Sequence, residues 1–332
     1  MSDGAVRAAI AGVGIYVPEA VLTNRELSLK INAAEDYIVS RTGIMERHIA
    51  DPVEATSDLG VVAAQRAMDD AGVCGDDIDL IIVATVSPDF PVPATACIIQ
   101  ERLGIKDAPA FDLSAACSGF VYALAVGSQF IAAGTYRTIL VIASEIFSRV
   151  INEYDIDTSV IAGDGAGAVV LRPSAAPGYG ILAMYLGADG SGVEQLYIPV
   201  GGTRTEATPE NVAAKMHKAK MNGQDVFRFA MRTLPDSTER AVKLAGLAME
   251  DVALIIPHQA NLRIIVAAAH RMNLPMDKFM VNVERYGNTS SASIPIALHE
   301  ALETGRIKDR DIIVMTGFGA GLAWGSVVMR WG

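Results

Sequence analysis

The sequence predicts an α/β protein built from two copies of one unit, each with a sheet that is buried on both faces. The first observation is an internal repeat: AGVCGDDIDLIIVAT at 71–85 aligns without a gap with AGLAMEDVALIIPHQ at 245–259, about half the chain away. The second is an alternation of continuous apolar segments with amphipathic ones, which is typical of strands covered by helices on both faces. A repeat this long indicates a duplicated unit and not a short-period solenoid.

The same alternation gives the elements in order, with strands on apolar runs such as TILVIA and helices on amphipathic stretches. In the first half we expect strands at 8–15, 79–85, 109–112, 138–144 and 166–171, and helices at 57–70, 94–103 and 117–133. The second half repeats the pattern, with strands at 181–187, 253–257, 279–283, 311–316 and 323–330, and helices at 224–244, 261–272 and 290–303. The Pro- and Gly-rich segment 172–180 is the expected seam, so the predicted halves are 1–174 and 175–332.

Composition narrows the class of protein. The 332 residues carry a formal net charge of −11, which argues against a nucleic-acid binder because phosphate contacts need clustered Lys and Arg. Three cysteines without metal-type spacing indicate reduced thiols in a cytoplasmic protein, and we expect Cys74 and Cys97 to be inert buried residues. The first ten residues lack the pattern of a signal peptide. The uncharged stretch 113–136 contains several Ser, Gly and Gln residues, so we expect a buried helix there and not a membrane span.

Three polar residues in apolar surroundings suggest covalent acyl chemistry. Cys117 lies where an apolar strand ends and a long apolar helix begins, and a helix start favours the thiolate that attacks carbonyls. His258 follows a strand in IIPHQAN, and Asn288 lies in YGNTSSA. The repeat puts the helix starts near Cys117 and Asn288 in equivalent positions, so a pseudo-twofold arrangement would bring them together. The Gly-rich segments do not complete a nucleotide-binding motif, and no metal-ligand spacing is present.

Six segments together resemble one family. They are SRTGIMERHI, SAACSGF around Cys117, GDGAGAVVL, PHQANLRI around His258, YGNTSSASIP around Asn288, and GFGAGLAWG at 317–325. In this order and spacing they are similar to β-ketoacyl-acyl-carrier-protein synthase III, the initiating condensing enzyme of bacterial fatty-acid synthesis. The resemblance covers nearly the whole chain. It implies a thiolase-like fold with a five-layered αβαβα architecture and mixed buried sheets.

The resemblance also implies a two-step reaction without a cofactor, in which acyl-coenzyme A is a substrate. Cys117 takes the acyl group from a thioester, and the backbone N–H groups of Cys117 and Ala320 form an oxyanion hole. A malonyl thioester on acyl carrier protein then loses CO2, and His258 and Asn288 stabilise its enolate as neutral hydrogen-bond donors. The resulting carbanion attacks the acyl-Cys117 and gives a β-ketoacyl product.

Substrate-binding residues follow from the same resemblance. They are expected to be Tyr37, Arg41, Val92, Gly223, Phe227, Asn261, Arg263 and Phe318. Two departures are notable. Where the family often has an Arg–Gly pair, this chain has Ile156 and Asp157, which weakens the prediction of coenzyme A and leaves open an acyl donor carried on a protein. Val92 stands where a larger aromatic residue is often found, which suggests room for longer or branched acyl groups.

Three further expectations concern partners. Acyl carrier protein is acidic, so a chain of this net charge needs a local basic patch for docking. One candidate is Arg263, His270 and Arg271 on the helix at 261–272; the other is the cluster KMHKAK at 215–220, although either could be an ordinary solvated surface. The family forms homodimers through the first half, and we expect the same here.

Other functions remain open from sequence alone. A thiolase-fold acyltransferase or secondary-metabolite synthase would keep Cys117 and use another donor or acceptor, although such relatives often alter the His or Asn. A Cys–His thioester hydrolase needs a general base and a water channel. A non-catalytic binding subunit would have lost the nucleophile.

Overall fold

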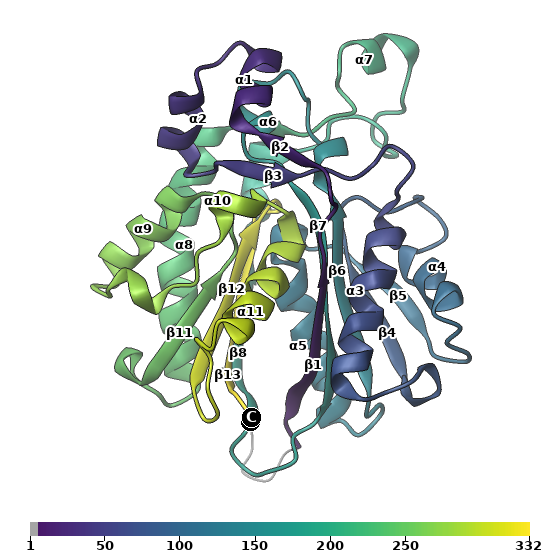
Figure 1. Ribbon diagram of the computed structural model, residues 1–332, viewed down its shortest axis with the longest axis vertical. Helices are drawn as coiled ribbons and strands as arrows, with labels where there is room; N and C mark the ends of the chain where they lie inside the picture. The colour runs from purple at the N-terminus through teal and green to yellow at the C-terminus, as the bar shows by residue number, and fades with distance from the viewer. Residues whose placement is uncertain (1–5) are drawn as a thin grey trace.

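The computed structural model describes residues 6–332, and its first sheet lies in the first half of the chain (Figure 1). Its strands are β1 (Ala8–Tyr16), β4 (Leu80–Ala84), β5 (Ala110–Leu113), β6 (Ile139–Ile146) and β7 (Asp164–Pro173). They lie in the order β1-β7-β6-β4-β5. Strand β4 is parallel to both β5 and β6, whereas β7 is antiparallel to both β6 and β1, so the sheet is mixed as predicted.

The second sheet repeats that order with one strand fewer. Its strands are β8 (Gly180–Ala188), β11 (Val252–Pro257), β12 (Ile312–Gly319) and β13 (Ala323–Arg330), in the order β11-β12-β13-β8. Strand β11 is parallel to β12, and the other pairs are antiparallel. Each strand thus matches the one at the same place in the first sheet, which supports the predicted duplication. The exact division at 174 and 175 stays a prediction.

The strand predicted at 279–283 is wrong. This segment makes only an isolated bridge between Ile255 and Phe279, at the edge where the fifth strand of the sheet would lie. The reason is the side chain of Gln259, whose amide group replaces the ladder: Nε2 donates to the Met280 carbonyl at 3.0 Å, and Oε1 accepts from the Asn282 N–H at 3.1 Å. The chain then turns into α10 (Val283–Tyr286), which leads toward Asn288.

Helices form three layers around the two sheets, which gives the five layers expected (Figure 1). One outer layer contains α3 (Thr56–Ala71) and α4 (Thr95–Arg102), and the other contains α8 (Gly223–Leu244) and α9 (Leu262–Arg271). The central layer contains α5 (Gly119–Ala132) and α11 (Ser293–Glu303), which pack between the sheets. Within it, Phe120 and Leu124 are fully buried, and burying a side chain of this size contributes ~2 kcal/mol.

The uncharged segment that includes α5 therefore forms the centre of the protein, as predicted. Strands of both sheets pack against this helix. Within the part of the chain that the structure describes, no helix combines the length and apolar character that crossing a membrane requires. Cys74 and Cys97, in contrast, are exposed, so the prediction that they are buried is wrong. Cys74 lies at a surface turn, where its N–H donates to the Asp77 carboxylate.

Short elements cover one end of the sheets and form the upper part of Figure 1. They are β2 (Val21–Thr23), α1 (Asn24–Ile31), α2 (Glu35–Thr42), β3 (Glu46–His48), α6 (Ile156–Ser159), β9 (Leu196–Tyr197), α7 (Pro209–Ala213) and β10 (Lys220–Met221). Arg47 ties several of them together, because its buried guanidinium donates to the Asn24 side chain and to the Val160 carbonyl. This end of the molecule contributes the mouth of the cavity described next.

Candidate active site

Cys117 lies at the centre of the molecule, between β5 and α5. The chain leaves β5 at Leu113 and enters a short 3-10 helix, η2 (Ala116–Ser118), directly before α5. Ala116 has a φ of 48°, a conformation that non-glycine residues rarely adopt and that costs ~1–3 kcal/mol. This tight turn aims the Cys117 side chain into the interior, where the residue is 7% exposed.

The Gly-rich end of β12 packs directly against the backbone of Cys117. A Cβ at Gly319 would lie 2.7 Å from the Cys117 nitrogen, and one at Gly317 would lie 2.9 Å from the Ser118 Cα. Glycine is therefore required at both positions for the two segments to approach. Among the described residues, the N–H groups of Cys117 and Ala320 donate to no backbone carbonyl; Cys117 lines the cavity, whereas Ala320 directly follows the cavity-lining Gly319.

Burial raises the pKa of the Cys117 thiol to about 12, and the nearby Glu145 carboxyl acts in the same direction. A hydrogen bond with the Ser290 hydroxyl, 3.5 Å from the sulfur, lowers it only in part. The thiol is thus the resting form at neutral pH. This outcome differs from the prediction that the start of the helix favours the thiolate, because desolvation of the sulfur outweighs the field of the helix.

His258 follows β11 and is held on three sides. Its backbone N–H donates to the Thr316 carbonyl at 2.8 Å, its ring stacks edge-on against Phe318, and its Nδ1 lies 2.7 Å from the Ser293 Oγ. Burial lowers the pKa of His258 to about 3, so the ring is neutral. The Gln259 N–H donates to the same Ser293 Oγ, and when the Ser293 hydroxyl donates to Nδ1 in turn, the ring proton lies on Nε2, the tautomer that a donor role in the cavity requires.

Asn288 is fixed by the backbone of the first half. Its N–H donates to the Ile161 carbonyl at 2.7 Å, and its own carbonyl accepts from the Gly163 N–H at 3.0 Å. The side-chain Oδ1 accepts from the Ser290 N–H at 2.8 Å. Since Oδ1 is occupied in this way, the Nδ2 donor is the group that Asn288 presents to the cavity.

A cavity of about 700 Å³ joins these three residues to the molecular surface. Its wall contains most of the residues predicted to bind substrate: Tyr37, Arg41, Gly223, Phe227, Asn261, Arg263 and Phe318. At the mouth, the guanidinium groups of Arg41 and Arg263 lie over the rings of Tyr37 and Phe227, each 5.3 Å from the ring centre. The Asn261 side chain donates to the Arg41 carbonyl at 2.9 Å and connects α2 to the N-terminus of α9.

Two predicted features lie differently from the rest. Val92 is 84% exposed and lies outside the cavity wall, so its role in the size of the acyl site stays a prediction. Ile156 and Asp157, which stand in place of the family's Arg–Gly pair, do line the cavity. The departure therefore lies where a substrate would pass.

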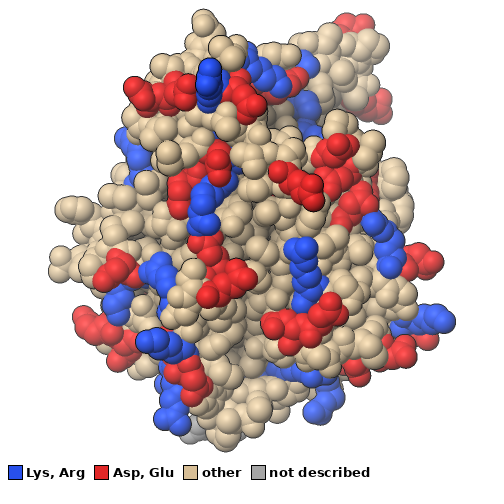
Figure 2. All heavy atoms as spheres, in the orientation of Figure 1, with Lys and Arg blue, Asp and Glu red and all other residues tan. Residues whose placement is uncertain are grey.

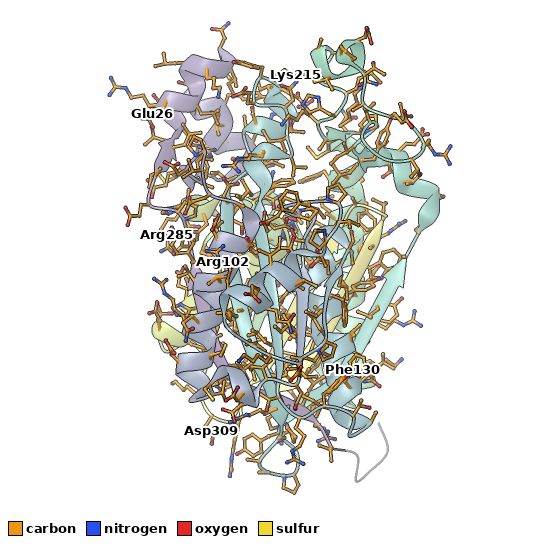
Figure 3. All side chains as sticks on the ribbon, turned by 90° about the vertical axis from the view of Figure 1, so that its right-hand side faces the viewer. Glu26, Arg102, Phe130, Lys215, Arg285 and Asp309 are labelled. Carbon is orange, nitrogen blue, oxygen red and sulfur yellow. The ribbon has the colours of Figure 1, made fainter. Side chains whose placement is uncertain are left out.

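The two basic clusters differ in how free their charges are. On α9, Arg271 pairs with Asp236 of α8, which leaves Arg263 and His270 as the less engaged groups. In the other cluster, Lys218 donates to the Arg149 carbonyl. Lys215 lies at the end of the molecule that the short elements cover, as does Glu26 (Figure 3). On the face drawn in Figure 2, acidic and basic side chains alternate, and neither sign gathers into one large patch.

Comparison with known proteins identifies the family. The profile of 3-oxoacyl-[acyl-carrier-protein (ACP)] synthase III matches residues 111–190, and that of its C-terminal part matches 242–331. The chain belongs to the β-ketoacyl-acyl-carrier-protein synthase III family. Curated members from Symbiobacterium thermophilum and Caldanaerobacter subterraneus are 51% and 49% identical over 97% and 98% of this chain, and over 98% of their own lengths.

Solved structures agree. The family member from Aquifex aeolicus is 41% identical, with a TM-score of 0.90 over 98% of this chain and 100% of its own. A priming β-ketosynthase from a polyketide biosynthetic pathway is 35% identical, with a TM-score of 0.91 over 100% of this chain and 98% of its own. The predictions of a thiolase fold and of an acyl-transferring condensing enzyme for fatty-acid synthesis are thus confirmed.

Sequence reasoning missed three polar residues beside the site: Glu145, Ser290 and Ser293. Ser290 and Ser293 were visible in the run NTSSAS, but only the fold reveals that one contacts Cys117 and the other His258. Glu145 lies near the end of the apolar strand β6, and a lone carboxylate in such a strand is the signal that could have drawn attention to it. In the described part of the chain, no cluster of His, Cys, Asp and Glu is arranged to hold a metal ion.

Proposed function

We propose that this protein condenses an acyl primer, carried on coenzyme A, with a malonyl group carried on acyl carrier protein, through an acyl-Cys117 intermediate. The single observation that carries the proposal is the meeting of Cys117, His258 and Asn288 in the wall of one cavity. Three separate segments contribute them, and backbone hydrogen bonds from other parts of the chain hold His258 and Asn288. The product would be a β-ketoacyl group on acyl carrier protein.

In the first step the Cys117 sulfur attacks the thioester carbonyl and releases coenzyme A. The developing oxyanion needs two donors, and the unpaired N–H groups of Cys117 and Ala320 are suited to that role. Such donors are commonly worth ~3–4 kcal/mol each. Thioester exchange is close to neutral in free energy, so the main requirements are removal of the thiol proton and this oxyanion site.

In the second step the malonyl thioester loses CO2, and the electron pair of the broken C–C bond passes to the thioester enolate. The neutral His258 Nε2–H and the Asn288 Nδ2–H would both donate to the enolate oxygen. A protonated imidazolium is not required, since the low pKa of His258 keeps the ring a neutral donor over the working range of pH. The enolate carbon then attacks the acyl-Cys117 carbonyl and expels the sulfur.

The cavity mouth suits coenzyme A. Arg41 and Arg263 supply cations for phosphates, and the rings beside them offer faces for an adenine. Asp157 in the wall is an acidic residue where a cation would help, so a carrier-protein thioester is the alternative donor. That observation, together with the similarity to a polyketide priming synthase, favours priming of a secondary metabolite as the second candidate function.

The remaining partners are part of the same proposal. Acyl carrier protein would dock beside the mouth, against Arg263 and His270 of α9, since Arg271 is already paired. A second copy of the chain would pack against the first half and cover Phe90 and Val92, which are 56% and 84% exposed. We place the enzyme in the cytoplasm, where both thioester substrates would be made and used.

Intact-protein mass spectrometry tests the proposal. The protein is mixed with a panel of acyl-coenzyme A thioesters, beside a Cys117→Ala variant. The expected result is a stable acyl adduct on the wild type alone, and the preferred chain length reports the size of the acyl site. Labelling only by acyl carrier protein thioesters would mean that the acyl donor is carried on the carrier protein and not on coenzyme A. Absence of labelling by either would overturn the proposal.

A further inference from the structure

One buried carboxyl group near the site has no role in the reaction described so far. Glu145 is the last residue but one of β6, is fully buried, and among the described residues has no cationic partner. A carboxyl group in such a place is costly unless hydrogen bonds or a proton compensate it. Its position at the junction of the two halves, close to Cys117, raises the question of what it does.

Five donors surround the Glu145 carboxyl. Oε2 accepts from the Val86 N–H and from the hydroxyls of Thr85 and Ser87 at distances of 2.8–3.2 Å. Oε1 faces the hydroxyls of Ser290 and Ser291, at 3.0 and 2.7 Å. The Ser291 hydroxyl can instead donate to the Ala84 carbonyl, which lies 3.1 Å away. Its oxygen can then accept a hydrogen bond from a protonated Glu145 carboxyl. The surroundings therefore accommodate both the ionised and the protonated group.

Ser290 connects this carboxyl to the nucleophile. Its Oγ lies 3.5 Å from the Cys117 Sγ and 3.0 Å from the Glu145 Oε1. A hydroxyl has one proton, so it can donate to one of these neighbours while accepting from the other. Transfer of the thiol proton requires the arrangement in which the Cys117 S–H donates to the Ser290 oxygen while the Ser290 hydroxyl donates to Glu145 Oε1. No hydrogen bond joins the sulfur to His258 or Asn288 in the described structure. The contacts from Cys117 through Ser290 to Glu145 are therefore the path that the geometry provides for the thiol proton.

We propose that Glu145 and Ser290 form a proton relay that activates the Cys117 thiol; this inference rests on the proposed acyl-Cys117 chemistry. As the sulfur attacks the thioester, its S–H bond breaks, the proton passes to the Ser290 oxygen, and the Ser290 proton passes to Glu145. The S–C bond to the acyl group forms, and the thiolate of coenzyme A leaves. When condensation later expels the Cys117 thiolate, Glu145 returns the proton through Ser290, which restores the starting state.

The acid–base character of the group fits this role. Burial raises the pKa of Glu145 above its ordinary value, because the buried site disfavours the charged carboxylate and so favours uptake of a proton. Cys117 on η2 is the titratable group that faces it; the other neighbours are hydroxyls and an amide from the loop after β4 and from the 3-10 helix η7 (Ser290–Ala292). On β7, Asp164 is bound instead by Ala50 and Ser148.

The test compares acylation rates of four proteins across neutral and alkaline pH: wild type, Glu145→Gln, Ser290→Ala and Ser291→Ala. Rapid-quench mass spectrometry follows the Cys117 adduct with the best acyl-coenzyme A of the panel. Ser291→Ala is the matched control, because this serine contacts the same carboxyl oxygen but no contact with the sulfur is present. Circular dichroism and thermal melting establish that each variant is folded.

We expect Glu145→Gln and Ser290→Ala to slow acylation about 100-fold at neutral pH, in the range of a lost general base. Ser291→Ala should slow it much less and keep the plateau, because it removes one donor to Glu145 but no contact with the sulfur. The wild-type rate should reach a plateau, because proton removal is internal, whereas the Gln variant should gain about tenfold per pH unit as it comes to depend on hydroxide. Glu145→Asp should restore part of the rate and the plateau.

Two results would overturn the relay. A purely electrostatic Glu145 raises the Cys117 pKa, so its neutralisation in the Gln variant would then speed acylation at neutral pH. A purely structural role would slow acylation by one factor at every pH, and Ser291→Ala would be as harmful as Ser290→Ala. If Glu145→Gln does not fold, the two serine variants decide. Wild-type protein that gains no adduct would instead contradict the proposed function itself.

Discussion

The two helices of the central layer, α5 and α11, begin with the same kind of tight backbone turn, but the two turns present different functional groups. Ala116 and Ser290 both have positive φ values, 48° and 50°, and each lies in or beside a 3-10 turn that leads into α5 or α11. The first turn presents Cys117, the proposed nucleophile, and the second presents hydroxyls and the Asn288 amide. Duplication thus supplied two equivalent tight turns at one centre, and their sequences differ in the groups they present: a thiol at one and hydrogen-bonding groups at the other.

The side of the site that carries Cys117 and the side that carries His258 and Asn288, here called the nucleophile side and the donor side, also differ in how burial shifts the pKa values of their titratable groups. Burial keeps His258 neutral, which is the form its proposed donor role needs, but it also keeps Cys117 protonated, which its nucleophilic role does not need. The donor side is therefore ready in the resting state, whereas the nucleophile side requires a proton acceptor. Variants on the two sides should accordingly affect different steps.

The largest expected effect comes from removing the nucleophile. Cys117→Ala should abolish both the acyl adduct and β-ketoacyl product, because no other thiol faces the cavity among the residues described. The double variant Cys74→Ala and Cys97→Ala is the control, and should keep full activity because both thiols are at the surface. Mass spectrometry and product assays measure both; loss of activity in the double variant would contradict the assignment.

Variants of His258 and Asn288 should impair the condensation step and leave the acylation of Cys117 intact. His258→Ala and Asn288→Ala should still form the acyl adduct but lower condensation about 100- to 1000-fold each, the usual effect of removing a donor from a developing oxyanion. Release of CO2 from the malonyl thioester and formation of the adduct are measured separately. If either variant stopped acylation instead, the division of labour between the two helix starts would be wrong.

Much of this contrast could be predicted from sequence, because it depends on motifs and on the repeat. Cys117, His258 and Asn288 each lie in a motif, and the repeat indicated that two helix starts converge. What could not be predicted depends on three-dimensional contacts. Gln259 replaces a strand with its side chain, Ser293 sets the ring proton of His258, and the burial that raises the Cys117 pKa arises only when both halves pack together.

The pH dependence of stability gives a smaller test of the donor side. The pKa of His258 falls from an ordinary value near 6.5 to about 3 in the folded protein. A depressed pKa means that stability is fully present above the unfolded pKa and is lost as pH falls toward the folded one. His258→Gln should remove this loss, so the difference in unfolding free energy between wild type and variant should change by about 1.4 kcal/mol per pH unit below ~6.5.

Chemical denaturation at several pH values measures that difference. Other buried groups, Glu145 included, titrate in both proteins and cancel in the comparison, provided that the variant keeps the Ser293 contact. A difference that stays constant below neutral pH would mean that His258 is protonated in the folded protein. The neutral donor role would then be contradicted.

The smallest expected effect lies at the mouth, where charges are exposed and water screens them. Arg41→Ala and Arg263→Ala should each raise the KM for acyl-coenzyme A about three- to tenfold, with kcat nearly unchanged, because the cations contact only the distant phosphates of the substrate. Arg271→Ala is the matched control, since this guanidinium already pairs with Asp236 and lies outside the cavity wall. The KM increase should shrink as salt is added. An effect on kcat of similar size would instead mean that the mouth helps to align the thioester with Cys117, and the separation between binding at the surface and chemistry at the two helix starts would have to be redrawn.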